Sequence, residues 1–278
     1  MTTKDSTIIK KIVRMNFDRS ADPYEEFERR FGLFHCLTKE LAELCDVRKG
    51  MRVCDIGCGS GTSSFALQKI VGSEGIVYGV DFSEKMLEIA QAKLNKENAN
   101  IKFMLIDADE LEANVDFKFH AVLYNASIFL IPEPMKTLQS TYRILTEKGM
   151  VGMNFLIGLY GSNSELSKAD RQRDDLFLLA KKAGKPFAPY GRKITDAGEI
   201  PKALRDIGFK NIEEGVLSKK MSLEEWKTFY SIPAQSAGLW PRNKYEERLR
   251  LLDSLVEYLQ NLNISAYYQF WGWYIARK

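Results

Sequence analysis

The spacing of apolar residues changes near residue 50. Before this point, four leucines recur every three or four residues and so share one face of a helix: Leu33, Leu37, Leu41 and Leu44. Gly50 then ends the helical pattern. The pattern predicts a helical N-terminal segment over residues 1–49, followed by a segment rich in strands.

Five short apolar, β-rich runs follow, and helical stretches such as 62–70 and 134–145 separate most of them. The runs occupy residues 52–56, 76–80, 101–106, 121–124 and 150–156. Strands that alternate with helices in this way form βαβ units with right-handed crossovers. The sequence therefore predicts an α/β protein with a mostly parallel, Rossmann-like sheet and helices on both faces.

The pattern is looser beyond residue 156. Helices are predicted at 170–183, 196–207 and 243–262, a Pro/Gly loop at 184–192, and strands at 211–221 and 267–276. In the last helix, Asn243 with Glu246 three residues later resembles a capping box. The apolar face of this helix suits either packing on the sheet or contact with a second copy, so a homodimer is one expectation.

Residues 157–278 are thus predicted to complete the sheet, with helical insertions at about 157–205 and 222–262. The second insertion is rich in aromatic residues: Trp226, Phe229, Tyr230, Trp240 and Tyr245. Aromatic side chains at this density suit a lid over an apolar, planar substrate. Helices that merely pack on the sheet would use the same residues.

The composition excludes several classes of protein. With 45% apolar residues among 278, the chain is not disordered, and no apolar run approaches the length of a membrane span. Forty basic and 37 acidic residues leave a net charge of +3, which does not favour a nucleic-acid partner. The four cysteines form no CxxC pair, and residues 1–11 lack a cleavable signal. We therefore expect a cytoplasmic protein.

The stretch Asp55-Ile56-Gly57-Cys58-Gly59-Ser60-Gly61 stands between the first strand and the next helix. Glycines there let the backbone turn tightly and approach a ligand. A dinucleotide fingerprint is excluded, because Thr62 stands where its third glycine belongs and an acid would repel phosphate. A cationic ligand without phosphate reverses that argument. S-adenosylmethionine, which carries an ammonium and a sulfonium, fits this description.

The pattern Asp-x-Gly-x-Gly-x-Gly resembles motif I of the class I S-adenosylmethionine-dependent methyltransferases. Other landmarks of that family follow in order at the strand ends: Asp81, Asp107-Ala108, Asn125 and the stretch 143–149. The resemblance covers about residues 50–156, and residues 273–278 resemble the closing strand of the family. The chain is similar to the small-molecule type found in ubiquinone and menaquinone biosynthesis.

The resemblance implies a seven-stranded sheet and S-adenosylmethionine as cofactor. It assigns cofactor contacts to the glycine loop, to the strand ends and to two neighbouring apolar side chains: Asp55, Gly57, Cys58, Gly59, Gly61, Asp81, Phe82, Met86, Asp107, Ala108 and Asn125. In the family, the acid at the place of Asp81 takes the ribose hydroxyls, and the Asp-Ala pair takes the adenine. Cys58 and Met86 equally suit plain packing.

In-line methyl transfer needs positioning and exclusion of water, and it needs a base only when the acceptor is weakly acidic. The N-terminal segment of the family often folds over the pocket, which makes Tyr24 and His35 the candidates for catalysis. His120 begins the fourth strand, at the end opposite to where ligands bind, and is expected to be structural. No metal is predicted.

The sequence therefore predicts a methyltransferase that acts on a small, apolar or aromatic organic molecule. Two alternatives stay open. A regulatory module would bind the cofactor without turnover, since no catalytic base is assigned. An RNA or protein methyltransferase is disfavoured by the absence of a basic stripe in the sequence.

Overall fold

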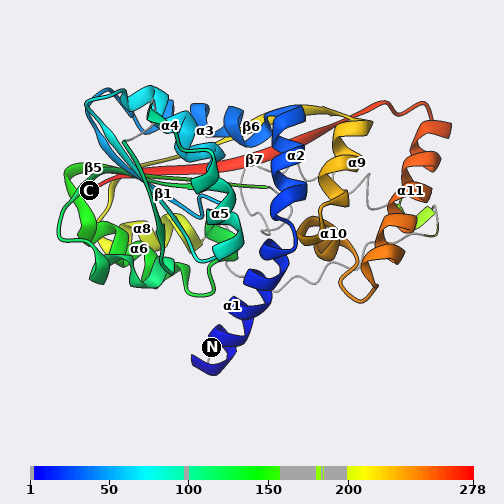
Figure 1. The fold of residues 1–278 in the computed structure, drawn as a ribbon, viewed down its shortest axis with the longest axis horizontal. Helices are drawn as coiled ribbons and strands as arrows, with labels where there is room; N and C mark the ends of the chain where they lie inside the picture. Colours follow the sequence, from blue (N-terminus) through cyan, green and yellow to red (C-terminus); the bar gives the residue numbers. More distant parts are fainter. Residues whose placement is uncertain (1–2, 97–99, 157–179, 183, 185–198) are drawn as a thin grey trace.

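The computed structural model describes residues 3–96, 100–156, 180–182, 184 and 199–278. Its centre is a seven-stranded sheet with the order β3-β2-β1-β4-β5-β7-β6 (Figure 1). The strands are β1 (Arg52–Ile56), β2 (Ile76–Asp81), β3 (Ile101–Leu105), β4 (Phe119–Asn125), β5 (Leu145–Leu156), β6 (Lys210–Ser222) and β7 (Ala266–Arg277). Strands β1 to β5 pair in parallel, and β7 runs antiparallel to both of its neighbours. The predicted fold is confirmed.

Helices cover both faces of the sheet, because alternate strand residues point to opposite faces. On one face, α3 (Leu33–Leu44) and α4 (Thr62–Val71) bury Leu41 and Leu67 against Leu123 of β4. On the other, α6 (Pro134–Ile144) and α8 (Glu199–Ile207) bury Leu138 and Leu204. A further helix, α5 (Glu84–Ala92), and two 3-10 turns, Ala108–Asn114 and Ile128–Leu130, lie at the strand connections.

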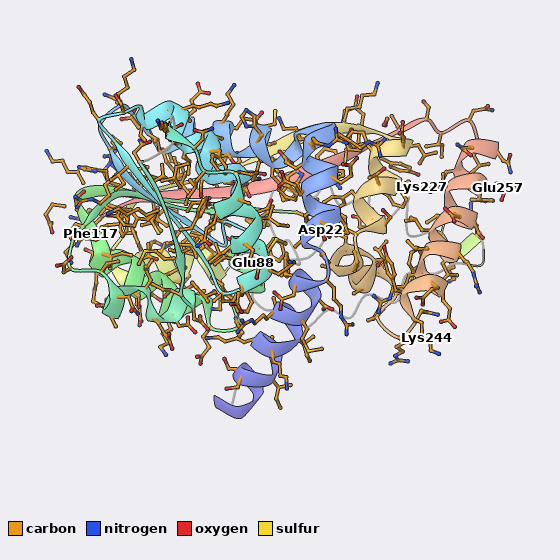
Figure 2. The ribbon with its side chains drawn as sticks, in the orientation of Figure 1. Asp22, Glu88, Phe117, Lys227, Lys244 and Glu257 are labelled. Carbon is orange, nitrogen blue, oxygen red and sulfur yellow. The ribbon has the colours of Figure 1, made fainter. Side chains whose placement is uncertain are left out.

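A separate apolar cluster joins the two ends of the sequence. It brings together α2 (Ala21–Phe31), α9 (Leu223–Ser231), α10 (Pro233–Leu239), α11 (Tyr245–Asn261) and the start of β7. Figure 1 shows α9 and α10 beside α2, with α11 beyond them near the start of the long β7, while α1 (Thr3–Asp18) runs outward from the body. Charged side chains such as Asp22, Glu88 and Glu257 stay exposed on the outer faces of the helices (Figure 2).

The helix α11 corrects two expectations. Its N-cap is Lys244, whose N–H donates to Glu247 at 3.2 Å, one residue beyond the predicted capping box. The shift arises because Asn243 is held in the preceding turn by its N–H bond to Trp240. The apolar face of α11 is buried within the chain through Leu252, Leu255, Val256 and Leu259, so it is not a free dimer face.

Other predicted elements fall partly outside the described residues. These are the helix at 170–183, the loop at 184–192, the first part of the helix at 196–207 and most of the insertion at 157–205. The predicted division of the chain into three segments stays a prediction. None of the helices in the described ranges combines the length and apolar character that crossing a membrane requires.

Candidate active site

A cavity of about 360 Å³ opens at the carboxyl ends of β1 to β4. This is where parallel α/β sheets bind their ligands. Its floor is the glycine loop, its sides are the ends of β2, β3 and β4, and its roof comes from α1, α2 and α10. We call the part around Gly59, Asp81 and Asp107 the nucleoside end. The part around Phe34, Phe229 and Trp271 is the aromatic end.

The glycine loop needs its glycines for two different reasons. At Gly57 the φ angle is +73°, and a Cβ would lie 2.5 Å from the Cβ of Ser127, so only glycine lets β1 and β4 approach here. At Gly59 the φ angle is +54°, but a Cβ would meet only the Met86 sulfur at 3.9 Å. The loop is therefore packed tightly on the β4 side and open on the cavity side. Gly61 follows as the N-cap of α4.

Asp55 lies beneath this loop and does not line the cavity. The prediction expected it beside the ligand. Strand alternation turns its side chain toward α4 instead, where Oδ2 accepts from the Ser64 hydroxyl at 2.7 Å. Its other oxygen has no hydrogen-bond partner among the described residues. Burial raises the pKa of Asp55 to about 7. A buried, unpaired acceptor under the loop suits a cationic ligand above it.

Asp81 lines the cavity at the end of β2. One carboxylate oxygen accepts from the Gly59 N–H and the other from the Ser83 N–H, both at 2.8 Å. Desolvation raises its pKa, and these backbone donors oppose the shift. Each oxygen retains a second lone pair for a hydroxyl in the cavity. Phe82 and Met86 line the cavity beside it.

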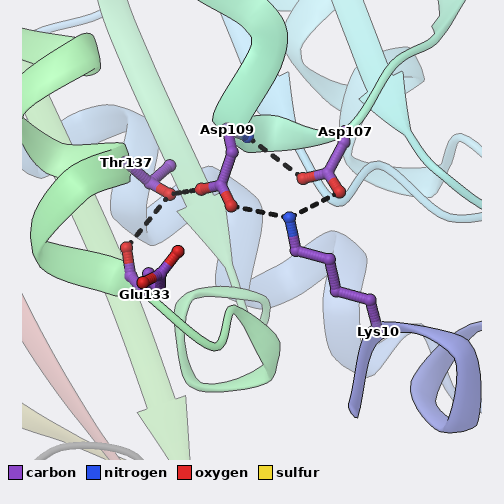
Figure 3. A network of polar contacts seen from close by, with 5 residues as sticks. All are labelled: Lys10, Asp107, Asp109, Glu133 and Thr137. Carbon is purple, nitrogen blue, oxygen red and sulfur yellow. Dashed lines mark hydrogen bonds and ion pairs between the residues drawn. The ribbon is translucent and has the colours of Figure 1, made fainter. Parts of the chain in front are cut away.

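Asp107 lines the cavity at the end of β3, next to Ala108, and it pairs with a residue that the sequence did not suggest (Figure 3). The ammonium of Lys10, on α1, lies 2.7 Å from Asp107 Oδ2 and 2.6 Å from Asp109 Oδ2. The Asp109 N–H donates to Asp107 Oδ1 at 3.1 Å, and the Thr137 hydroxyl donates to Asp109. Lys10 itself lines the cavity.

Asn125 reaches the cavity at the end of β4, but its amide is already paired within the protein. Its Nδ2 donates to Thr38 Oγ1 at 2.7 Å and to Ser63 Oγ at 2.9 Å. Its Oδ1 accepts from Asn154, which is completely buried and whose own Oδ1 accepts from the Ala126 N–H at 2.7 Å. This network holds Ala126 at a φ of +56°, so Asn125 shapes the turn.

The aromatic end is walled by rings from distant parts of the chain. Phe34 of α3 lies 6.4 Å from the ring of Phe229 and meets Trp271 of β7 edge to face at 6.3 Å. Tyr24 of α2 stacks on Phe17 of α1 at 5.6 Å, and its hydroxyl accepts from Gln235 Nε2 at 2.6 Å. These side chains form a largely apolar compartment, and the Tyr24–Gln235 pair lies in its wall.

The two candidates for catalysis differ in position. Tyr24 lines the cavity, and burial raises the pKa of its hydroxyl well above the ordinary value, so it stays protonated at neutral pH. His35 does not line the cavity, so its role as a base stays a prediction without support from the geometry of the cavity. The backbone N–H of His35 donates to the Glu28 carboxylate. Desolvation and the nearby Lys39 and Lys69 lower the pKa of the His35 ring.

Glu28 is a cavity group that sequence reasoning missed. Its carboxylate accepts from the N–H groups of Phe34 at 3.0 Å and His35 at 2.8 Å, and so caps the start of α3. Desolvation raises its pKa. The only signal in the sequence would have been Gly32, a break that lets α2 turn back over α3.

His120 and the two cysteines of the glycine-loop region differ in their relation to the cavity. His120 accepts from the Arg52 N–H at 2.9 Å at the amino end of β4, as its predicted structural role requires. Cys54 is buried and does not line the cavity, whereas Cys58 is buried in the glycine loop and lines it, and burial raises the pKa of both thiols. Over the described ranges, no three His, Cys, Asp or Glu side chains group as metal ligands would.

The sheet order, the glycine loop and the acids at successive strand ends define a Rossmann-like, nucleoside-binding protein. Residues 47–172 match the family described as a methyltransferase domain. This segment therefore matches a methyltransferase domain, in agreement with the class I S-adenosylmethionine-dependent type that the sequence predicts.

Named relatives agree with this family. The chain is 40% identical over 105 residues to demethylmenaquinone methyltransferase of Staphylococcus aureus, covering 38% of this chain and 43% of that one. It is 31% identical over 143 residues to aklanonic acid methyltransferase DauC of Streptomyces, covering 51% and 64%. The matches thus span less than two thirds of either relative.

Solved structures share the fold over most of the chain. A putative methyltransferase from Bacillus halodurans is 17% identical, with a TM-score of 0.56, and covers 87% of this chain and 98% of that one. The YcgJ protein from Bacillus subtilis is 14% identical, with a TM-score of 0.58, and covers 88% and 98%. At these identities the likeness is one of fold.

Proposed function

We propose that this protein transfers the methyl group of S-adenosylmethionine to a small, apolar, aromatic organic molecule. The observation that carries the proposal is the continuous cavity, which joins an acidic nucleoside end to an aromatic end. One ligand at each end would place a donor and an acceptor in the same cavity. The names of the two relatives support an acceptor that is a small organic molecule.

At the nucleoside end, the residues suit a phosphate-free, cationic nucleoside. Asp81 would accept from the two ribose hydroxyls, and Asp107 with the Ala108 N–H would take the adenine edge. Phe82 and Met86 offer apolar surface to the base. The open backbone at Gly59 admits the methionine part without steric conflict. Acids at two strand ends would repel a pyrophosphate, which argues against a dinucleotide.

At the aromatic end, α9 and α10 would cover the acceptor. Phe34, Phe229 and Trp271 present ring faces and edges to a planar molecule. The bound cofactor supplies an activated methyl group on its sulfonium. The chain then has to hold the acceptor in line and exclude water.

The polar groups at this end suit binding better than proton removal. Tyr24 keeps its proton, since burial raises the pKa of its hydroxyl, and it can donate to a carbonyl or phenolate oxygen of the acceptor. Gln235 holds that hydroxyl in place. An acceptor that is acidic enough to ionise by itself fits this arrangement, because no base then has to act.

The experiment is calorimetry with S-adenosylhomocysteine on the full chain, followed by mass spectrometry of a panel of quinols, phenols and aliphatic acids with S-adenosylmethionine. We expect binding and methylation of a planar, acidic acceptor. Asp81→Asn should weaken the binding at least tenfold, because two charge-assisted hydrogen bonds are lost.

Glu88→Gln is the matched control, because Glu88 is an exposed acid on α5 that contacts Lys85 and lies outside the cavity. It should bind S-adenosylhomocysteine as the wild type does. Absence of binding to the wild type would overturn the proposal. Binding with no methylated product from any acceptor would favour the regulatory module.

A further inference from the structure

Lys10 occupies an unusual place for a lysine near the start of a chain. It projects from α1 into the nucleoside end of the cavity, where its ammonium bridges Asp107 and Asp109, nearly one hundred residues away in sequence (Figure 3). Its side chain is only 25% exposed. Exposed ion pairs between long side chains contribute little, but a bridging contact at a cavity wall is screened less by solvent.

The two carboxylates need this cation. Asp107 and Asp109 both direct Oδ2 at the same ammonium, and the Asp109 side chain is only 6% exposed. Without Lys10, two neighbouring negative charges would repel each other. Asp109 is also held by the Thr137 hydroxyl, whereas Asp107 has no such side-chain anchor among the contacts found. Asp107 is therefore the carboxylate that would move.

The geometry around Asp107 fixes the direction of its carboxylate. Lys10 holds Oδ2, and the Asp109 N–H holds Oδ1. Each oxygen keeps one lone pair for a donor in the cavity. A donor that lies in the carboxylate plane, such as the exocyclic amine of adenine, would find this acceptor already oriented.

We propose that Lys10 is a positioning residue which, by bridging Asp107 and Asp109, orients Asp107 toward the adenine amine and so makes the cavity select adenosyl ligands over those that lack this amine. This inference rests on the proposed function, since it requires the nucleoside to bind at this end. It adds to that function a determinant of base selectivity that lies on α1, outside the matched methyltransferase domain.

Two roles for Lys10 predict different results. If Lys10 only anchors α1 over the cavity, its loss weakens the binding of every nucleoside equally. If Lys10 acts through Asp107, its loss weakens the binding of a ligand that carries the amine more than the binding of a ligand that lacks it. S-inosylhomocysteine separates the two roles, because it carries a carbonyl oxygen where S-adenosylhomocysteine carries the amine.

The experiment measures the dissociation constants of both ligands by calorimetry for the wild type, Lys10→Gln, Lys10→Arg and Lys11→Gln. Lys11 is the control, because it is an exposed lysine on the same helix and does not line the cavity. We expect Lys10→Gln to weaken the binding of S-adenosylhomocysteine roughly tenfold and the binding of S-inosylhomocysteine less than threefold, as the loss of one charge-assisted contact implies. Lys10→Arg should restore most of the selectivity, and Lys11→Gln should match the wild type.

An equal loss for both ligands in Lys10→Gln would overturn the inference and leave Lys10 as an anchor of the cover. Unchanged binding of both ligands would overturn it as well. These outcomes leave the proposed function intact, because the wild type still binds the nucleoside. If the wild type binds neither ligand, the proposed function fails and the inference fails with it.

Discussion

The two ends of the cavity are built by different means. At the nucleoside end, the acids and the glycine loop come from one stretch of about fifty residues, and backbone N–H groups hold Asp81 in place. At the aromatic end, Phe34, Phe229 and Trp271 come from opposite ends of the chain and are placed by packing against one another. One end is specified by a local motif, and the other by the tertiary fold.

This difference follows the comparisons with known proteins. The matched domain, residues 47–172, contains the strand ends of the nucleoside end and none of α9, α10 or β7. The family match thus covers the strand ends of the nucleoside end and not the helices that carry the aromatic end. Two predictions test how tightly the nucleoside end is built, and a third tests whether a substitution at the aromatic end separates acceptor selection from cofactor binding.

The first prediction concerns Gly57, where a large loss of stability is expected. Gly57→Ala should lower the free energy of unfolding by about 3 kcal/mol, because it adds a left-handed strain to a Cβ overlap with Ser127. Gly50→Ala is the control, since Gly50 has a φ of +80° with nothing within 4 Å, and it should cost about 1 to 2 kcal/mol. Urea unfolding measures both. Equal costs would mean that the approach of β1 to β4 is not tight.

Much of this nucleoside end could be predicted from the sequence. Apolar runs and their terminal acids placed Asp81 and Asp107 at neighbouring strand ends, because parallel strands end on the same edge of the sheet. The prediction placed Asp55 beside the ligand, although the alternation of side chains along the strand already indicates the opposite face. It shares strand parity with the buried Val53, so its side chain packs toward the helices rather than the cavity.

The rest of the site could not be predicted, because it depends on contacts between distant segments. Nothing around Lys10 or Gln235 in the sequence indicates that α1 meets Asp107 or that α10 meets Tyr24. Asn125 was placed correctly at the end of β4, but only the structure shows its amide bonded to Thr38 and Ser63. Hydrogen-bond partners across a fold leave no periodic signal in the chain.

The second prediction uses pH to test the electrostatics under the glycine loop. Burial raises the pKa of Asp55 from an ordinary value of 3.8 to about 7, so between these values the folded protein binds more protons than the unfolded chain. The free energy of unfolding should therefore fall as pH rises through this range, by up to about 1.4 kcal/mol per pH unit from this group.

Asp55→Asn isolates this contribution, because it removes the titration and keeps an acceptor for Ser64. Urea unfolding at several pH values should give a flatter profile for the variant than for the wild type, with the two curves furthest apart above pH 7. Parallel profiles would mean that the pKa of Asp55 is the same in the folded and the unfolded chain, so that burial under the glycine loop does not raise it.

The smallest effect is expected at the aromatic end, and it is the sharpest test of the separation. Tyr24→Phe removes the hydroxyl that accepts from Gln235 and keeps the ring stacked on Phe17, so it should lower kcat/KM for the acceptor about fivefold, or ~1 kcal/mol. The dissociation constant of S-adenosylhomocysteine should stay within about twofold of the wild-type value, because no contact at the nucleoside end changes.

Tyr230→Phe is the control, since Tyr230 packs on Trp226 and does not line the cavity. Tyr24→Phe could instead weaken the binding of S-adenosylhomocysteine as much as it lowers kcat/KM for the acceptor. The two ends would then act as one site, and the aromatic end would not be a separate acceptor site.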